Sequence, residues 1–447
     1  MRRQVLVGVD AGTTSIKALA VGLDGTILAE SSSPTPWRHD GPLADADADE
    51  LARAAVQTCA SAAEAAGEVE VAGIGVTGIA EAGALIDGSG RPCAPVLAWF
   101  DPRGDAAAVR AAVTPRDYQR ATGRRLNSKP SLMKILWLRA NVESSTRAVQ
   151  HLCVAEWIVH ALGGEQVSEA SLASRTGMLD ITRREPWPGA VELVGDLLPS
   201  QRIWAGDPAG RASGDDVPAI LRGAALTVAG LDHQAAVLIS GAARDGALFD
   251  SMGTAEALIR TVREHRSVDD IEWLTDRDID VDWSVLPNHQ ILLAGRLTGL
   301  TLERVAAMLG AANRPARLVL GEAALTAGST AAPRLLDVSN DAITLGNITD
   351  GISPAVTWRA VVEDLADMAG EALAQMAENA GPHVTSVLGG GWTRNAMVAD
   401  AKRRRLVDPR FVDISEPGAL GAAFLAGVAA GVLDRPGADG VPCWASA

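Results

Sequence analysis

Two short polar loops, far apart in the chain, carry residue types that suit phosphate binding. The first loop has the sequence DAGTTS and follows an apolar, strand-like run. Its glycine lets the backbone approach a ligand, and the hydroxyls of Thr13, Thr14 and Ser15 can hold phosphate oxygens together with backbone N–H groups. Asp10, at the end of the apolar run, is a candidate ligand for a hydrated magnesium ion. Taken alone, the loop is equally compatible with an ordinary polar hairpin turn.

The second loop repeats the first near the middle of the chain. In the segment GALFDSMGTAEALIR, the pair Gly12 and Thr13 recurs 241 residues later as Gly253 and Thr254, again between two apolar runs. This offset is close to half of the 447 residues, so we interpret it as an internal duplication. The repetition favours phosphate binding by both loops over two unrelated turns.

The duplication predicts two α/β domains, 1–243 and 244–447, each opening with a hairpin. No low-complexity linker separates them, so we expect a close, hinged junction. In the first domain the apolar patterning predicts strands in 4–30 and 68–78 and helices in 45–66, 118–142 and 144–163.

A carboxylate lies just before this predicted boundary. In VAGLDHQAAVLISGA an apolar strand ends at Gly230, and Asp232 precedes a helix-like run. A carboxylate at such a place is often only a helix N-cap. Because the boundary places it at the cleft between the domains, Asp232 is also a candidate base for the hydroxyl that attacks a γ-phosphate.

Two glycine-rich segments suggest nucleotide contacts of different kinds. LGGGWTRNAMVADAKRR places three glycines before a helical pattern, which suits either contact with adenine or ribose or a tight strand-to-helix turn. GIGVTG, with Gly73, Gly75 and Gly78, matches a dinucleotide fingerprint and keeps a nicotinamide-dependent oxidoreductase as an alternative. The fingerprint should open a helix, but IAEAGALIDGSGRP runs into a turn and a proline.

Composition limits the classes of partner. The formal charge is −15, from 40 basic and 55 acidic residues, which argues against nucleic-acid binding. The four cysteines lie far apart, so neither a disulfide framework nor a zinc cluster is expected. The longest uncharged apolar run, 419–433, is too short to cross a bilayer, and we expect a buried helix there, no membrane association and a cytoplasmic location.

Taken together, these segments resemble the FGGY carbohydrate kinases of the actin-like ATPase superfamily. The resemblance rests on DAGTTSIKAL, GIGVTGIAEAGALID, WFDPR, PSLMKILW, GLDHQAA, the SMGT loop, LGGGWTRN and EPGALGAAFLAG, in that order over nearly the whole chain. It implies an α/β fold of two ribonuclease-H-like domains with a catalytic cleft between them. It also implies ATP and Mg²⁺ as cofactors and a small sugar, ketose or polyol as substrate.

The resemblance assigns roles to individual positions. Asp232 occupies the catalytic base position, and Asp10 the magnesium position. The positions that would contact ATP are Thr13, Thr14, Ser15, Gly253, Thr254, Gly299, Glu303, Gly391 and Asn395. Glu81 falls where glycerol kinases carry a substrate-binding glutamate.

Departures from the family pattern leave the substrate open. Ala80 stands where glycerol kinases have an arginine and xylulokinases a methionine. Lys129 replaces a small or aromatic residue near the sugar, and His233 follows the base in place of Asn or Gln, so both are candidate sugar contacts. A non-catalytic actin-like nucleotide-binding protein is a further alternative, and the oligomeric state stays open, with a homodimer as one option.

Overall fold

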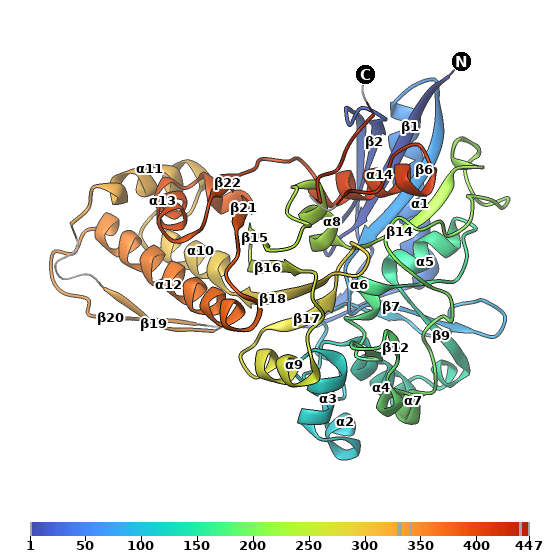
Figure 1. The fold of residues 1–447 in the computed structure, drawn as a ribbon, viewed down its shortest axis with the longest axis horizontal. Helices are drawn as coiled ribbons and strands as arrows, with labels where there is room; N and C mark the ends of the chain where they lie inside the picture. The colour runs from blue at the N-terminus through green and yellow to red at the C-terminus, as the bar shows by residue number, and fades with distance from the viewer. Residues whose placement is uncertain (1, 329–332, 340–341, 438–439, 446–447) are drawn as a thin grey trace.

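The computed structural model describes residues 2–328, 333–339, 342–437 and 440–445 and is built around two mixed β-sheets (Figure 1). The strands of the first sheet are, in spatial order, β3 (Ile27–Pro34), β2 (Ser15–Gly22), β1 (Arg3–Ala11), β6 (Val69–Gly78) and β14 (Ala225–Leu231). Those of the second are β17 (Asp280–Trp283), β18 (Gln290–Arg296), β16 (Glu256–Val262), β15 (Ala247–Met252), β21 (Thr385–Gly389) and β22 (Pro409–Phe411).

The two sheets share one topology. In the first, β1 is antiparallel to β2 and parallel to β6, and β6 is parallel to β14. In the second, β15 is antiparallel to β16 and parallel to β21, and β21 is parallel to β22. This order is the ribonuclease-H-like arrangement, and it places the turn at Gly12 and the turn at Gly253 at equivalent hairpins. The duplication inferred from the two loops is therefore a duplication of topology.

Helices cover both faces of the first sheet. Helices α1 (Ala48–Ala65) and α5 (Val154–Ala161) pack on one face, and α8 (Asp232–Ile239) and α14 (Pro417–Ala429) on the other. One apolar cluster joins Leu6 of the first sheet, Phe424 of α14 and Phe249 of the second sheet. Helices α8 and α14 therefore form a layer between the two sheets.

Small residues let α14 lie directly on the strands. A Cβ added to Gly8 would be 1.9 Å from the carbonyl oxygen of Ala419, and one added to Gly75 would be 2.1 Å from that of Ala422. Gly73 and Gly75 thus lie inside strand β6 and serve helix packing, whereas a dinucleotide fingerprint needs them in a turn that opens a helix. The oxidoreductase interpretation of GIGVTG is therefore wrong.

The second sheet carries a group of helices, most of which lie at the end of the molecule away from the first sheet (Figure 1). They are α9 (Val268–Thr275), α10 (Thr298–Met308), α11 (Arg314–Leu325), α12 (Pro354–Ala380) and α13 (Ala396–Arg405), with the hairpin β19 (Arg334–Val338) and β20 (Ile343–Gly346). The chain passes from the first sheet through α8 to the second and returns through α14. The boundary near Ala243 stays a prediction.

Most of the smaller elements belong to the stretch of chain that connects β6 to β14. They are β7 (Gly83–Asp87), β8 (Val96–Leu97), α2 (Ala106–Ala112), α3 (Pro115–Thr122), α4 (Ser131–Asn141), β9 (Ala148–Cys153), α6 (Ala170–Ala173) and α7 (Pro188–Val194). The helix expected over 144–163 is wrong for its first half, because residues 148–153 form β9 and pair with β7. The apolar residues of this segment fit a helix by their spacing, but they also fit a strand that is buried by packing against other elements.

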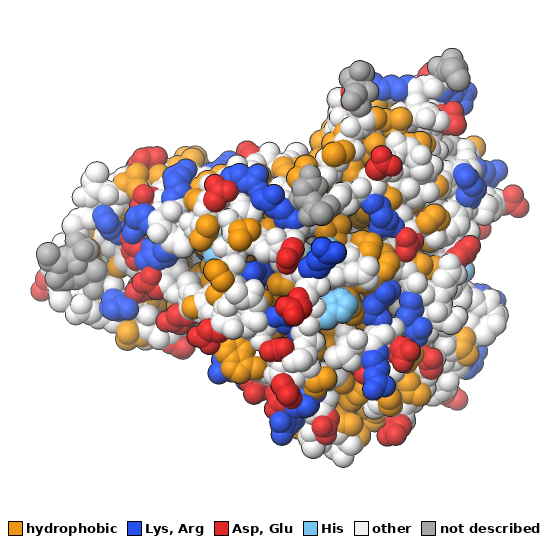
Figure 2. Space-filling model, in the orientation of Figure 1, with side chains coloured by type: hydrophobic (Ala, Val, Ile, Leu, Met, Phe, Trp, Pro, Cys, Tyr) orange, Lys and Arg blue, Asp and Glu red, His pale blue; other side chains and the backbone are white. Residues whose placement is uncertain are grey.

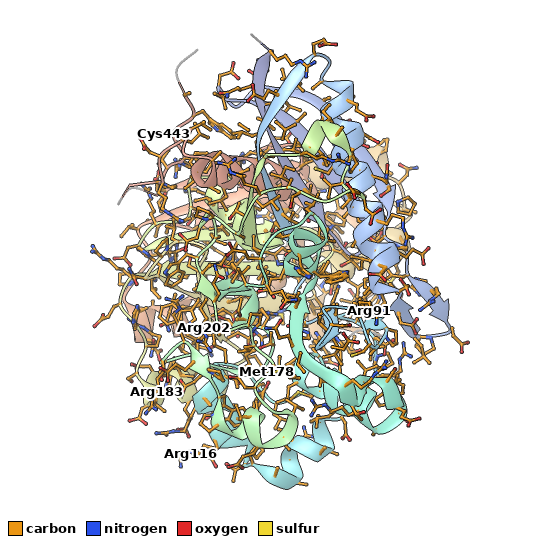
Figure 3. The ribbon with its side chains drawn as sticks, turned by 90° about the vertical axis from the view of Figure 1, so that its right-hand side faces the viewer. Arg91, Arg116, Met178, Arg183, Arg202 and Cys443 are labelled. Carbon is orange, nitrogen blue, oxygen red and sulfur yellow. The ribbon has the colours of Figure 1, made fainter. Side chains whose placement is uncertain are left out.

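Surface features agree with the composition. On the face shown in Figure 2, acidic and basic side chains are interspersed over both halves of the molecule. No helix in the described part of the chain is long and apolar enough to span a membrane. The four cysteines are unpaired, and Cys443 is exposed on the C-terminal segment (Figure 3).

Candidate active site

A cavity of about 310 Å³ opens at the carboxyl ends of the central strands. Its wall includes Asp10 at the end of β1 and Asp232 at the start of α8. The opposite wall comes from the second sheet and includes Gly391, Arg394 and Asp413. The cavity therefore brings together Asp10 of the first sheet, Asp232 of α8 and a glycine-rich loop that follows a strand of the second sheet.

Asp10 is a half-buried carboxylate of this cavity. Its Oδ1 atom is buried and has no hydrogen-bond partner. Burial, followed by the nearby charges of Asp232 and Glu416, raises the pKa of Asp10 to about 8, and Lys17 only partly offsets this. An ionised Asp10 therefore needs a cation, and a divalent ion bound to the unpartnered oxygen would supply it.

Helix α14 determines the surroundings of Asp10. A Cβ added to Gly418 would lie 2.4 Å from Asp10 Oδ2, so only glycine permits this approach. Glu416, the residue before the helix, has a φ of 46° and accepts hydrogen bonds of 2.8 and 2.7 Å from Lys17 Nζ. This ion pair ties α14 to β2, the strand that pairs with β1.

Asp232 is in a more open environment than Asp10. Its side chain is 23% exposed, and its Oδ1 accepts a 2.7 Å hydrogen bond from the backbone N–H of His233. It lies in the first turn of α8, where the helix dipole favours an anion. Its second oxygen is available to accept a proton from a ligand in the cavity. The His233 side chain lines the same cavity and is 55% exposed.

A second cavity of about 330 Å³ adjoins the first, since Gly391 and Arg394 line both. Its walls include Gly253, Thr254 and Asn395, with Arg314, Arg317 and Trp392. The Arg317 guanidinium lies 5.2 Å from the centre of the Trp392 ring. Aromatic and cationic groups beside a glycine loop suit a purine nucleotide and its phosphates.

Of the residues expected at the nucleotide, Asn395 lines this second cavity, whereas Gly299 and Glu303 do not. A Cβ on Gly299 would lie 1.9 Å from the carbonyl oxygen of Gly253, so α10 supports the second loop from behind. Glu303 is exposed and pairs with Arg317 at 3.0 Å. The Asn395 side chain caps α13 and donates to the carbonyl oxygen of Arg317 at 2.7 Å.

Apart from Asp10, the residues of the first loop lie outside the lining of both cavities. The loop is held in place by tryptophans, since Trp37 Nε1 donates to the carbonyl oxygen of Thr13 and Trp99 Nε1 to its hydroxyl, each at 2.8 Å. Thr14 is exposed and Ser15 half-buried.

The expected sugar-binding residues divide into a buried and an exposed group. Glu81 is 5% exposed and lines a separate small cavity of about 10 Å³. Lys134 Nζ, in α4, donates to the carbonyl oxygens of Glu81, Trp99 and Lys129 at 2.9 to 3.0 Å. The Lys129 side chain is exposed, with Nζ 5.6 Å from the centre of the Trp99 ring.

Several residues at these sites were not predicted from the sequence. Lys17, Arg394 and Glu416 lie inside motifs that had been recognised, so the motifs themselves were the available signal. Arg124 and Arg175, which bind Glu81, have no local pattern that would reveal them.

Comparisons with known proteins agree with this architecture. Residues 5–197 match the N-terminal domain of the FGGY family of carbohydrate kinases. The chain is 27% identical over 466 residues to the L-fuculokinase of Escherichia coli (strain K12), covering 98% of this chain and 94% of that enzyme. It is 29% identical to the L-fuculokinase of Salmonella typhi over 275 residues, which cover 58% of this chain and 57% of that enzyme. The xylulose kinase of Rhodospirillum rubrum superposes with a TM-score of 0.85 at 22% identity, over 98% of this chain and 92% of the other.

The two-sheet fold, the cavity between the sheets and the matching family domain define one class of protein. Residues 5–197 carry the N-terminal domain of the FGGY family of carbohydrate kinases, and the whole chain is similar to carbohydrate kinases, which identifies a phosphotransferase that acts on a sugar or polyol.

Proposed function

We propose that this enzyme transfers the γ-phosphate of ATP to a hydroxyl of a small sugar, ketose or polyol, with Asp232 as the general base. The observation that carries the proposal is the placement of Asp10 and Asp232 in one cavity that adjoins the cavity of Gly253 and Trp392. The second cavity would hold the nucleoside, and its phosphates would extend past Gly391 toward the two carboxylates.

Asp232 accepts the proton of the substrate hydroxyl as its oxygen attacks the γ-phosphorus and ADP leaves. The hydrogen bond from the His233 N–H fixes one carboxylate oxygen and leaves the other for the substrate. The layer formed by α8 and α14 connects the two sheets, so a change in their relative position would close the cavity and exclude water.

Asp10 would hold Mg²⁺ through its unpartnered oxygen, with phosphate oxygens and water as the remaining ligands. When bound, the ion neutralises charge on the transferred phosphoryl group. Lys17 and Glu416 keep the surroundings of Asp10 in place, and the approach of Gly418 shields one side of the carboxylate.

For the substrate, we propose a polyhydroxylated molecule longer than glycerol. Ala80 lacks the donor that glycerol kinases have, and two exposed donors, Lys129 and His233, could bind further hydroxyls. The names of the aligned relatives make L-fuculose the first substrate to test. The cytoplasmic location and a homodimer stay predictions.

The test is an ADP-release assay with ATP and Mg²⁺ over a panel of L-fuculose, D-xylulose, other pentuloses and hexuloses, sugar acids and glycerol. We expect sugar-dependent ADP formation that EDTA abolishes, with a phosphorylated product of the correct mass. ADP release that no panel member increases, or a best substrate of glycerol, would contradict the proposal.

A further inference from the structure

Five ionisable side chains form a largely buried cluster between the first-domain elements and strand β17. Two guanidinium groups are shared by three carboxylates. The members are Glu81 after β6, Arg124 after α3, Arg175 after α6, and Asp280 and Asp282 on β17. The side-chain exposures of Asp282, Arg124, Glu81 and Arg175 are 0, 6, 7 and 14%. Figure 3 shows the side of the molecule that carries Arg116, at the start of α3, and Met178, which follows α6 in the chain.

Both arginines form ion pairs with the same three carboxylates, and their shared hydrogen bonds go to Glu81 and Asp282. Arg175 donates to Glu81 Oε1 at 2.7 Å and to Asp282 Oδ2 at 3.0 Å. Arg124 donates to the same Glu81 oxygen at 3.2 Å and to Asp282 Oδ1 at 3.0 Å. The fork of each guanidinium therefore spans from the loop of the first domain to a strand of the second sheet.

Stability alone is a poor explanation for this cluster. Burying several charges costs a large desolvation free energy, and apolar side chains of similar volume often serve as well. The Nε atoms of Arg124 and Arg175 are moreover buried without a hydrogen-bond partner, which adds to the cost. The cluster is costly in free energy and leaves two buried donors without partners. It is therefore better explained by the side chain that it positions.

The geometry of Glu81 indicates what is positioned. Its φ of 61° is unusual for a residue with a side chain, and Lys134 Nζ holds its carbonyl oxygen at 3.0 Å. Both arginines bind Oε1, and no donor in the described part of the chain forms a hydrogen bond with Oε2. One carboxylate oxygen is thus fixed and the other is left as an acceptor.

We propose that Arg175, together with Arg124, is a positioning residue for sugar binding, which holds Glu81 so that Oε2 accepts hydrogen bonds from sugar hydroxyls. Through Asp282 the same side chains make this acceptor depend on the second sheet as well as the first. The proposal rests on the kinase function proposed above and on the resemblance that places Glu81 among the sugar-binding residues.

The charges around Glu81 also determine its titration. It faces Arg124, Arg175 and Lys134, with Asp280 and Asp282 beyond the arginines and His151 across Gly83. Burial opposes ionisation, but Arg175, Arg124 and Lys134 outweigh it and lower the pKa of Glu81 to about 2. Loss of one arginine must move this pKa upward.

The experiment compares Arg175→Gln with the wild type, using the panel sugar that gives the highest turnover. We expect the KM for that sugar to rise about tenfold or more at pH 7, because a charged hydrogen bond that orients the acceptor is lost. The KM for ATP should stay within twofold. Between pH 7 and 5, the ratio of the variant's sugar KM to that of the wild type should increase as Glu81 becomes protonated.

Two further variants keep the test sharp. Arg175→Lys retains the charge but cannot bridge Glu81 and Asp282, so its sugar KM should still be several-fold above that of the wild type. This variant tests the proposal even if Arg175→Gln does not fold. Arg125→Gln is the matched control, because it removes an exposed ion pair with Asp278 at the same junction. Its sugar KM should equal that of the wild type.

A purely structural role predicts a different result. Folded Arg175 variants would then show a lower melting temperature or a smaller active fraction, with an unchanged sugar KM and pH profile, and the proposal would be overturned. An equal rise of KM in Arg125→Gln would overturn it as well. If Glu81→Gln raises the sugar KM and Arg175→Gln does not, the sugar pocket is correct and the positioning role is wrong. If the wild type phosphorylates no sugar, both proposals fall.

Discussion

The two carboxylates of the main cavity have different environments, and this difference separates their roles. Asp10 is enclosed by β1, β2 and the start of α14, with one oxygen unpartnered and a pKa raised by burial and by Asp232. Asp232 is partly exposed and lies in the first turn of α8. A carboxylate with a buried, unpartnered oxygen suits metal binding, and an open carboxylate that can take a proton suits base catalysis.

The substitution Asp232→Asn tests this division at the scale of one residue. The amide keeps the shape of the side chain but cannot accept the proton, so we expect kcat to fall by about 10² to 10⁴. The melting temperature and the Kd for ADP, measured by calorimetry, should change little. Retention of more than a tenth of the wild-type kcat on the best substrate would show that another group is the base.

At the scale of elements, glycines have two distinct uses. Those in β1, β6 and α14 remove side chains where helix and sheet backbones meet, as at Gly75 and Ala422. Gly253, in the turn between β15 and β16, has no such neighbour, since an added Cβ would meet nothing closer than 3.7 Å. Its side-chain position opens toward the cavity of Trp392 instead.

This distinction predicts the effect of Gly253→Val. The substitution should leave the free energy of unfolding within about 1 kcal/mol of the wild type, because no packed neighbour is displaced. It should weaken ATP binding about tenfold, since a branched side chain obstructs the approach of the phosphates to the backbone. Titration calorimetry with ATP and urea unfolding measure the two effects, and Gly88→Ala, in open space outside the site, is the control. Unchanged ATP affinity in the folded variant would remove Gly253 from the nucleotide site.

At the scale of the molecule, buried carboxylates give the stability a pH dependence. Glu156 accepts hydrogen bonds from the backbone N–H groups of Cys153 and Glu169, each at 2.7 Å. Burial raises its pKa to about 8 against an ordinary value near 4.5, and the charge of Glu169 adds to this. Between about pH 4.5 and 8, Glu156 of the native state therefore holds a proton that the same residue has already released in the unfolded chain.

From this shift we expect the free energy of unfolding to decrease as the pH rises from about 5 to 8, by about 2 kcal/mol or more. Glu156→Gln should lower stability at pH 5 and make the decrease over the same range smaller, and the remaining decrease comes from other carboxylates whose pKa is raised by burial, such as Asp10. Urea titrations at pH 5, 6, 7 and 8 measure the slope. Glu165→Gln, at an exposed position in the following loop, should keep the wild-type slope. An identical slope in wild type and Glu156→Gln would show that Glu156 is ionised in the native state.

Much of the fold could be predicted from local sequence because each signal depends on neighbouring residues. Apolar runs interrupted by GTTS and DG give β1, β2 and β3, and the repeated Gly-Thr pair gives the second hairpin. Residues 148–153 were misassigned because a short apolar run fits a helix or a strand, and only pairing with β7 decides between them.

For the site, the sequence by itself determined which motifs carry the carboxylates and glycine loops, and through them the family. Only the tertiary structure decided which residues share a cavity, that Gly73 and Gly75 pack against α14, and that Arg124 and Arg175 bind Glu81. The physical reason is that a motif is a property of adjacent residues, whereas an ion pair between Arg175 and Asp282 joins positions 107 residues apart. Such contacts exist only after the two sheets and the α8 and α14 layer have packed together.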